Sequence, residues 1–127
     1  MNVKAVCFAG LAAAFLGCPA FAHHSFAIFD QTQVLTRTGT VVEFEWINPH
    51  AWLHLRIVDD NGNAATWSFE GGSTNQLANL GWASDSFRPG EQVEIGYRPM
   101  KDGSRGGQIM AVTLPDGRKV CSNRGCG

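Results

Sequence analysis

The histidines of this chain are the residues whose type and position best suit metal chemistry: His23, His24, His50 and His54. If the chain is cut after Ala22, His23 presents an α-amine and an imidazole on one residue, and both nitrogens can chelate one ion. The α-amine gives up its proton readily to a metal because its ordinary pKa lies close to neutral pH. A further imidazole completes an all-nitrogen set suited to Cu(II), the tightest binder among the divalent first-row ions. The sequence therefore predicts a copper site from His23, His24 and His50, with His54 as a fourth candidate.

The spacing of the later histidines leaves a metal-free interpretation open. Residues four apart on a strand lie about 13 Å apart, so His50 and His54 share an ion only if His50 belongs to a loop. His54 has Trp52 on its own strand face and could pair with a carboxylate instead. Met100 and Met110 are candidate soft ligands for Cu(I), although Met110 also fits the packing pattern of a strand.

Two tryptophans suggest a different function. Trp46 and Trp52 flank Asn48-Pro49-His50, and tryptophan is enriched at binding hot spots. The pair could form the aromatic rim of a site for a periplasmic protein partner or a small ligand, or it could simply cover one end of the fold. The alternative to a metal site is therefore a metal-free module that binds through Trp46, Asn48, Pro49 and Trp52.

The sequence does not favour an enzyme. Ser25 lies beside His24, but adjacency along the chain does not create a nucleophile–base pair, and nothing fixes a third member. Glu43 and Glu45 are two residues apart on a predicted strand, which is typical of a solvated face. A copper oxygenase built on a terminal histidine is the catalytic alternative, and the sequence offers it no evident substrate platform.

The first residues have the pattern of a secretory signal over residues 1–22. Lys4 is followed by an apolar run over residues 5–16, then Pro19, and Ala20-Phe21-Ala22 supplies the small residues of a cleavage site. The run is shorter than the about 20 residues that cross a bilayer, so we expect no membrane span after cleavage. The pattern predicts a periplasmic or secreted bacterial protein.

A second processing route competes with cleavage after Ala22. Leu16-Gly17-Cys18 is similar to a lipoprotein cleavage box, and lipidation at Cys18 would leave His23 internal. Phe15 and Pro19 fit that box poorly. Removing the signal also removes Lys4 and leaves nine basic against eleven acidic side chains, which together with export argues against nucleic-acid binding.

Two cysteines remain after the signal, Cys121 and Cys126. In an oxidising compartment a disulfide is the expected state of such a pair. The loop it closes is short, so the chain-entropy estimate of its stabilisation is only about 2 kcal/mol. The bond would pin the C-terminal tail.

The order of the remaining elements predicts a mostly β fold. Short alternating runs suggest strands over residues 38–47, 51–58, 65–69, 93–97 and 109–114. Val42, Phe44 and Trp46 share one face of the first, and Glu70 projects outward from the third. A short helix follows the third strand, with Ser73 and Gln76 as a capping box and Gly81 at its end.

Three strands, one short helix between strands 3 and 4, and two further strands are the order of a small five-stranded OB-like barrel. We expect residues 23–37 to form an N-terminal segment, residues 38–120 the β-barrel domain and residues 121–127 a tail. Within the first segment, residues 26–34 could add a strand or lie across the barrel.

Several motifs resemble the small exported bacterial proteins of domain-of-unknown-function family 6152. They are Ala22-His23-His24-Ser25-Phe26, Gly39-Thr40-Val41-Val42, Trp46-Ile47-Asn48-Pro49-His50-Ala51, Trp67-Ser68-Phe69-Glu70, Leu80-Gly81-Trp82, Gly90-Glu91-Gln92-Val93 and Pro99-Met100-Lys101-Asp102-Gly103-Ser104. The resemblance implies a periplasmic location and a shared β fold. The family has no assigned activity, so the resemblance implies no catalytic residue.

Overall fold

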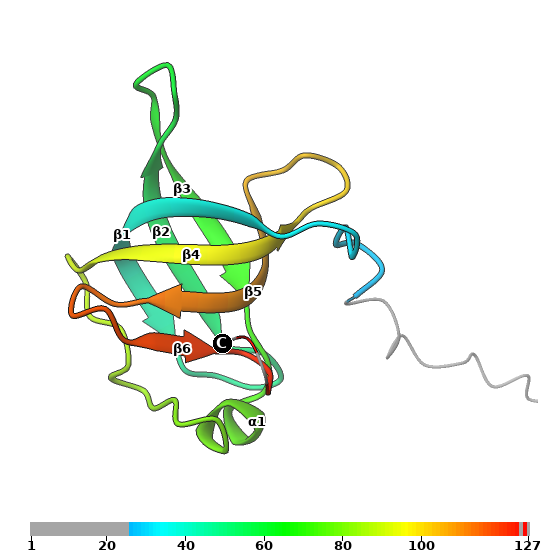
Figure 1. Ribbon diagram of the computed structural model, residues 1–127, viewed down its shortest axis with the longest axis vertical. Coiled ribbons are helices and arrows are strands. Elements are labelled where there is room, and N and C mark those ends of the chain that lie inside the picture. The colour runs from blue at the N-terminus through cyan, green and yellow to red at the C-terminus, as the bar shows by residue number, and fades with distance from the viewer. Residues whose placement is uncertain (1–25, 125, 127) are drawn as a thin grey trace, which may run out of the picture.

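The structure is a computed structural model, and it describes residues 26–124 and residue 126. This part of the chain forms six strands and one helix (Figure 1). They are β1 (Leu35–Glu45), β2 (Trp52–Val58), β3 (Ala64–Glu70), α1 (Thr74–Ala78), β4 (Gln92–Pro99), β5 (Gly106–Thr113) and β6 (Lys119–Cys121). The predicted signal, His23 and His24 lie outside the described residues.

The strands close into a barrel because β3 pairs with β5. The sheet order is β3-β2-β1-β4-β5-β6, and a parallel β3–β5 pairing joins its two sides (Figure 1). Every other neighbouring pair is antiparallel. The predicted five-stranded OB-like barrel with a short helix between β3 and β4 is confirmed. The short strand β6 extends the sheet beyond β5.

Two glycines allow β5 to pair closely with a strand on each side, β3 at Gly106 and β4 at Gly107. A Cβ atom on Gly106 would overlap the carbonyl oxygen of Ser68 on β3. A Cβ atom on Gly107 would overlap the carbonyl oxygen of Arg98 and lie 2.6 Å from the ring of Tyr97. Since real side chains do not approach so closely, the start of β5 must lack side chains for both neighbouring strands to reach it.

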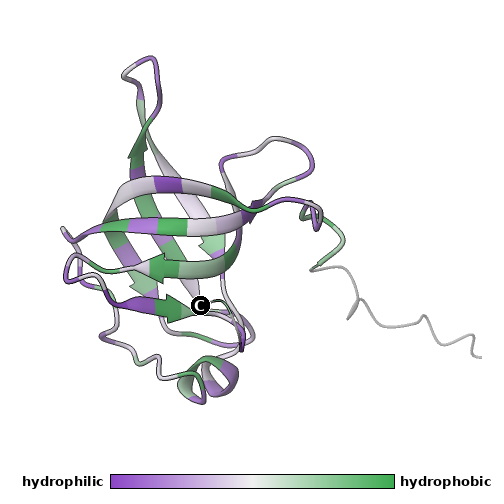
Figure 2. Ribbon diagram, viewed as in Figure 1, coloured by the Kyte–Doolittle hydropathy of each residue, from purple (hydrophilic) through white to green (hydrophobic). Residues whose placement is uncertain are grey.

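Apolar side chains fill the barrel interior. Those buried almost completely on the strands are Val41, Leu53, Leu55, Ile57, Phe69, Val93, Ile95, Tyr97, Ile109 and Val112. They alternate with more polar residues along the strands, because successive side chains of a strand point to opposite faces. In Figure 2 this alternation is visible as changes of colour along the ribbon of β4. An aromatic cluster closes one end, with the ring of Phe87 lying 4.9 Å from that of Phe44 and 5.2 Å from that of Trp82.

The expected face of β1 is wrong at one position. Val42 is 47% exposed, whereas Val41 is 2% exposed and belongs to the core. The pairing of β1 with β2 shifts between Val41 and Glu43, which is the signature of a β-bulge. The extra residue reverses the alternation, so Val41 and Phe44 both pack against the interior although they are three residues apart.

The helix begins and ends as predicted. The amide of Gln76 donates to Ser73 Oγ at 3.3 Å, and the amide of Ser73 donates to Gln76 Oε1 at 3.4 Å, so the capping box is present. Leu77 is fully buried under the barrel. Gly81 has a φ of 90°, its amide donates to the carbonyl of Ala78 at 3.0 Å, and the amide of Trp82 donates to the carbonyl of Leu77 at 3.0 Å, so the glycine terminates the helix.

Residues 26–34 run beside the end of β4 and do not add a strand to the barrel (Figure 1). Phe29 forms a single bridge with Met100, flanked by hydrogen bonds from Asp30 N to Pro99 O and from Lys101 N to Ile28 O. β1 then begins at Leu35, before the predicted residue 38. Among the described residues, no helix has the length and apolar character needed to cross a membrane.

Gly107→Ala should destabilise the barrel strongly, because its Cβ would meet the backbone of Arg98 on β4, which cannot move without opening the β4–β5 pairing. We expect a loss of unfolding free energy of about 1–3 kcal/mol or more, measured by urea denaturation. Gly96→Ala is the matched control, since a Cβ there would meet nothing closer than 3.8 Å. Equal losses in the two variants would show that the close approach does not matter.

Candidate functional site

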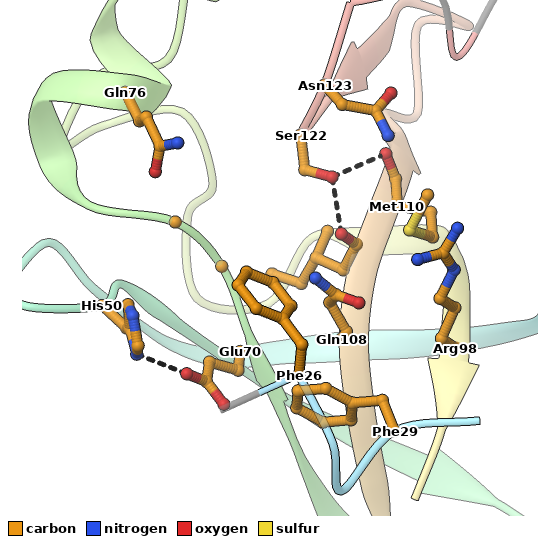
Figure 3. Close-up of a pocket in the computed structure, with 13 residues that line it drawn as sticks. Phe26, Phe29, His50, Glu70, Gln76, Arg98, Gln108, Met110, Ser122 and Asn123 are labelled. Carbon is orange, nitrogen blue, oxygen red and sulfur yellow. Dashed lines mark hydrogen bonds and ion pairs between the residues drawn. The ribbon is translucent and has the colours of Figure 1, made fainter. Parts of the chain in front are cut away.

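A cavity of about 240 Å³ lies on the outer face of the barrel, where the β1–β2 loop, the end of β3, β4 and β5 meet (Figure 3). Its polar lining includes His50, Glu70, Gln76, Arg98, Gln108 and Ser122. Phe26 and Phe29, from the segment that precedes β1, form part of its apolar wall together with Ile109. The cavity therefore collects residues from distant parts of the chain.

Glu70, the last residue of β3, projects outward as predicted, but neighbouring segments cover it. It faces away from the core, since its neighbour Phe69 is fully buried inside, yet only 8% of Glu70 is exposed. The β1–β2 loop and the segment at Phe26 and Phe29 bring their own residues to the same cavity. Burial removes water from the carboxylate and raises the pKa of Glu70, and the favourable charge of neighbouring His50 opposes only part of this shift.

His50 is held against this carboxylate. Its Nδ1 forms an ion-pair contact with Oε1 of Glu70 (Figure 3). The loop is fixed on both sides, because Ala51 N donates to Gly72 O at 2.9 Å and Gly71 N donates to Ala51 O at 2.8 Å. The side chain of His50 remains 34% exposed, so it is positioned without being sealed from solvent.

Asn48 fastens the same loop to the start of α1. Its Oδ1 accepts hydrogen bonds from the amide and the hydroxyl of Thr74, at 3.1 and 3.0 Å. Trp46 packs against the core, with its ring centre 5.8 Å from that of Phe44, and Trp52 is half-buried. Pro49 is exposed. Of the predicted partner-binding residues, two therefore also have contacts that stabilise the fold.

His54 lies on the β2–β3 surface with partners of its own. Its Nδ1 is 2.8 Å from the hydroxyl of Ser68, and its Nε2 is 3.7 Å from a carboxylate oxygen of Glu45. The structure thus joins His50 and His54 to different carboxylates. Across residues 26–124 and 126, no three His, Cys, Asp or Glu side chains come together as a metal site. The contribution of His23 and His24 falls outside the described residues.

A row of three polar residues crosses the cavity wall, and sequence reasoning missed it. Gln108 on β5 is the register partner of Glu70 on β3 and of Arg98 on β4. The pairing with Arg98 had a local signal, because a hairpin centred on Gly103 places these two residues opposite each other. The pairing with Glu70 had none, since it depends on the parallel seam.

Two atoms in this row lack hydrogen-bond partners within the described part of the chain: Nε of Arg98 and Oε1 of Gln108, both buried. The terminal Nη1 of Arg98 donates to the side-chain oxygen of Gln31. Unpaired buried polar atoms are uncommon in folded proteins and mark a place where a ligand, an ion or water completes the bonding. The row is therefore a candidate binding surface.

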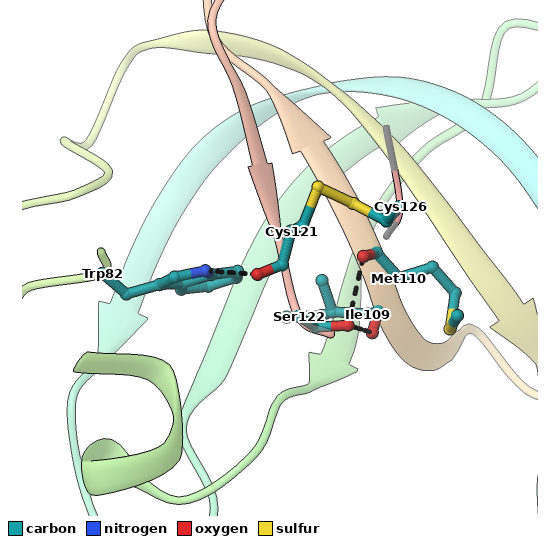
Figure 4. The surroundings of a disulfide bond; sticks show 6 residues. All are labelled: Trp82, Ile109, Met110, Cys121, Ser122 and Cys126. Carbon is teal, nitrogen blue, oxygen red and sulfur yellow. Dashed lines mark hydrogen bonds between the residues drawn. A yellow bond between two sulfur atoms is a disulfide. The ribbon is translucent and has the colours of Figure 1, made fainter. Parts of the chain in front are cut away.

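The disulfide that the sequence predicts between Cys121 and Cys126 is present, with Cα atoms 5.7 Å apart (Figure 4). The bond starts at Cys121, the last residue of β6. The carbonyl of Cys121 accepts a hydrogen bond from Nε1 of Trp82 at 2.8 Å. The hydroxyl of Ser122 donates to the carbonyl of Met110 at 3.1 Å. The tail is thereby fixed beside β5, where Ser122 lines the cavity.

Comparison with known proteins places the chain in a family. It belongs to the family of unknown function DUF6152, whose model matches residues 12–110. The resemblance found in the sequence is confirmed on this point, and the matched range includes His50, Glu70, Arg98 and Gln108. No curated protein and no solved structure matches the chain.

Glu70→Gln should change how stability depends on pH. Folding raises the pKa of Glu70 above the ordinary 4.5. Just above that pH the carboxyl group is therefore more fully protonated in the folded protein than in the unfolded chain. The corresponding stabilisation is complete below pH 4.5 and is lost as pH rises through the raised folded value. The unfolding free energy of the wild type relative to Glu70→Gln should therefore fall as pH rises above 4.5 and through the raised folded pKa.

Urea denaturation at a series of pH values measures this difference. Glu94→Gln is the control, because Glu94 is an exposed residue of β4. If the curves for wild type and Glu70→Gln run parallel over this pH range, burial of the carboxyl group has no energetic consequence.

Replacing both Cys121 and Cys126 by serine should lower the unfolding free energy by about 2 kcal/mol, since the bond closes only a short loop. Calorimetry of wild type with and without a thiol reductant provides the comparison. Reductant should lower the melting temperature of the wild type to that of the double variant and leave the variant unchanged. A loss that abolishes folding would mean that the tail supports the whole barrel.

Proposed function

We propose that this protein is exported to the periplasm and binds a transition-metal ion, copper(II) foremost, beside the cavity at the β1–β2 loop. The proposed ligands are His50 and the two histidines, His23 and His24, that begin the processed chain. Export rests on the signal pattern of residues 1–22.

The setting of His50 supports this assignment. A carboxylate against one ring nitrogen is the usual outer partner of a metal-binding histidine, because it holds the proton there and turns the lone pair of the other nitrogen toward the metal. Glu70 occupies that position at Nδ1. No hydrogen bond from another described residue reaches Nε2 of His50, which is therefore the proposed ligand atom.

The observation that carries the proposal is that Phe26 and His50 line the same cavity. His24 precedes Phe26 by two residues and His23 by three. An extended chain covers at most about 3.6 Å per residue, so the chain length limits the distance from Phe26 to about 7 Å for His24 and about 11 Å for His23. The order of the chain thus supports a meeting of the terminal amine with His50.

Of two further candidate ligands from the sequence, Met110 lies near the proposed site and His54 is left out of it. Met110 also lines the cavity, and its thioether would suit Cu(I), which favours copper over zinc. His54 is not part of the proposed site, because Ser68 and Glu45 lie against its two ring nitrogens.

Isothermal titration of Cu(II) into protein that begins at His23 should show tight one-to-one binding. Protein with one extra residue ahead of His23 should bind at least about tenfold more weakly, because the terminal amine is displaced from the chelate. His50→Gln should weaken binding similarly, while His54→Gln, the matched control, should leave it unchanged. Mass spectrometry of exported protein establishes the terminus.

Equally weak binding by all four proteins, or an exported chain that does not begin at His23, would contradict the metal proposal. Binding of a protein partner or small ligand through Trp46, Asn48, Pro49 and Trp52 would then be the function to test. Variants of Pro49 suit this test, because Pro49 is exposed, whereas the other exposed residue, Asn48, also holds the loop to Thr74.

A further inference from the structure

The cavity wall carries charge in an ordered sequence from β3 to β4. Glu70, Gln108 and Arg98 are successive register partners on adjacent strands, and all three line the cavity (Figure 3). Paired residues on neighbouring strands project to the same face, and the strands are about 4.8 Å apart. A carboxyl group, a neutral amide and a guanidinium therefore follow one another across about 10 Å.

The amide and the guanidinium are both incompletely bonded. Nε of Arg98 and Oε1 of Gln108 are buried without a hydrogen-bond partner in the described ranges, 26–124 and 126. In the same ranges no carboxylate lies within ion-pair distance of Arg98. Nε of Arg98 thus needs a hydrogen-bond acceptor, best a negatively charged one, and Oε1 of Gln108 needs a donor.

The rest of the cavity defines the size and polarity of what can enter. Phe26, Phe29 and Ile109 supply apolar wall beside this row. The volume of about 240 Å³ lies below the about 300–1,000 Å³ of pockets for drug-sized molecules. The occupant is therefore small and carries an apolar part as well as its polar groups.

We propose that this cavity binds a free α-amino acid with an apolar side chain. Because both atoms are buried, the side chains of Arg98 and Gln108 must turn toward the cavity when the ligand binds. The carboxylate then accepts from Nε of Arg98, and the ammonium group donates to Oε1 of Gln108 on the side of the row where Glu70 lies. The side chain packs against Phe26 and Phe29. A zwitterion fits this row because its carboxylate and its ammonium group are carried by adjacent carbons. The negative group then lies at Arg98, and the positive group lies at Gln108, toward Glu70.

This proposal does not depend on the metal proposal. The amino-acid subsite is formed by Arg98 on β4, Gln108 on β5 and the apolar wall of Phe26 and Phe29, and none of these residues is a proposed metal ligand. Every residue in it belongs to the described part of the chain. Binding is therefore tested on metal-free protein in the presence of a chelator. Failure of copper binding leaves that experiment intact, and failure of amino-acid binding leaves the copper titration intact.

Calorimetric titration of the processed chain with L-leucine in excess EDTA is the experiment. Leucine should bind, whereas 4-methylpentanoate, which lacks the ammonium group, and leucinamide, which lacks the carboxylate, should each bind at least about tenfold more weakly. Glycine, which lacks the apolar side chain, should also bind more weakly. These comparisons use the wild-type protein, so they hold even if a variant fails to fold.

Variants then assign the two polar contacts. Arg98→Lys keeps the charge but removes Nε, and Gln108→Met keeps the approximate shape but removes the acceptor. Each should weaken leucine binding at least about tenfold, while Arg56→Lys, at an exposed position on β2, should not change it. Circular dichroism checks that each variant is folded.

Three results would overturn the proposal. They are absence of leucine binding at millimolar concentration by folded wild type, equal affinity for leucine and both truncated analogues, and unchanged affinity in folded Arg98→Lys and Gln108→Met. In the first case, ordered water satisfies the two buried atoms.

Discussion

The parallel contact between β3 and β5 is the constraint on which the molecule depends. It joins β3, at one edge of the sheet, to β5 near the other edge, so the strands close around a core. This closure leaves no long unpaired strand edge between β3 and β5. It requires backbone to approach backbone at Gly106, where a Cβ atom would overlap the carbonyl oxygen of Ser68. The same seam sets Gln108 beside Glu70, so closing the barrel also assembles the wall of the cavity.

Burial of Glu70 is the second consequence of this architecture. Removing a carboxylate from water costs free energy, and the protein offsets part of that cost with the contact to His50. The contact is possible because backbone hydrogen bonds on both sides of Ala51 hold the β1–β2 loop against the chain that follows β3. A residue that would otherwise be an ordinary surface acid thereby becomes part of an organised polar site.

The cavity joins two chemically different sides. His50 with Glu70 forms one side, next to the segment that leads back to His23 and His24. Arg98 with Gln108 forms the other, where polar atoms are buried without partners among the described residues. The pairing of Glu70 with Gln108 across the β3–β5 seam brings these two sides into one cavity. The family to which the chain belongs, DUF6152, has no assigned function, and these two sides are where its chemistry can be sought.

Local patterns in the sequence determined the order of the strands, the capping box of α1 and the pairing of Cys121 with Cys126, because each depends on residues close together along the chain. The bulge at Val42 escaped that reasoning, since alternation by itself does not show where a strand inserts an extra residue. Only the tertiary structure decided that Glu70 is covered and that it stands in a row with Gln108 and Arg98. The physical reason is that the register of a parallel pair and the covering of a sheet face are set by packing between segments far apart in sequence, which local residue patterns do not encode.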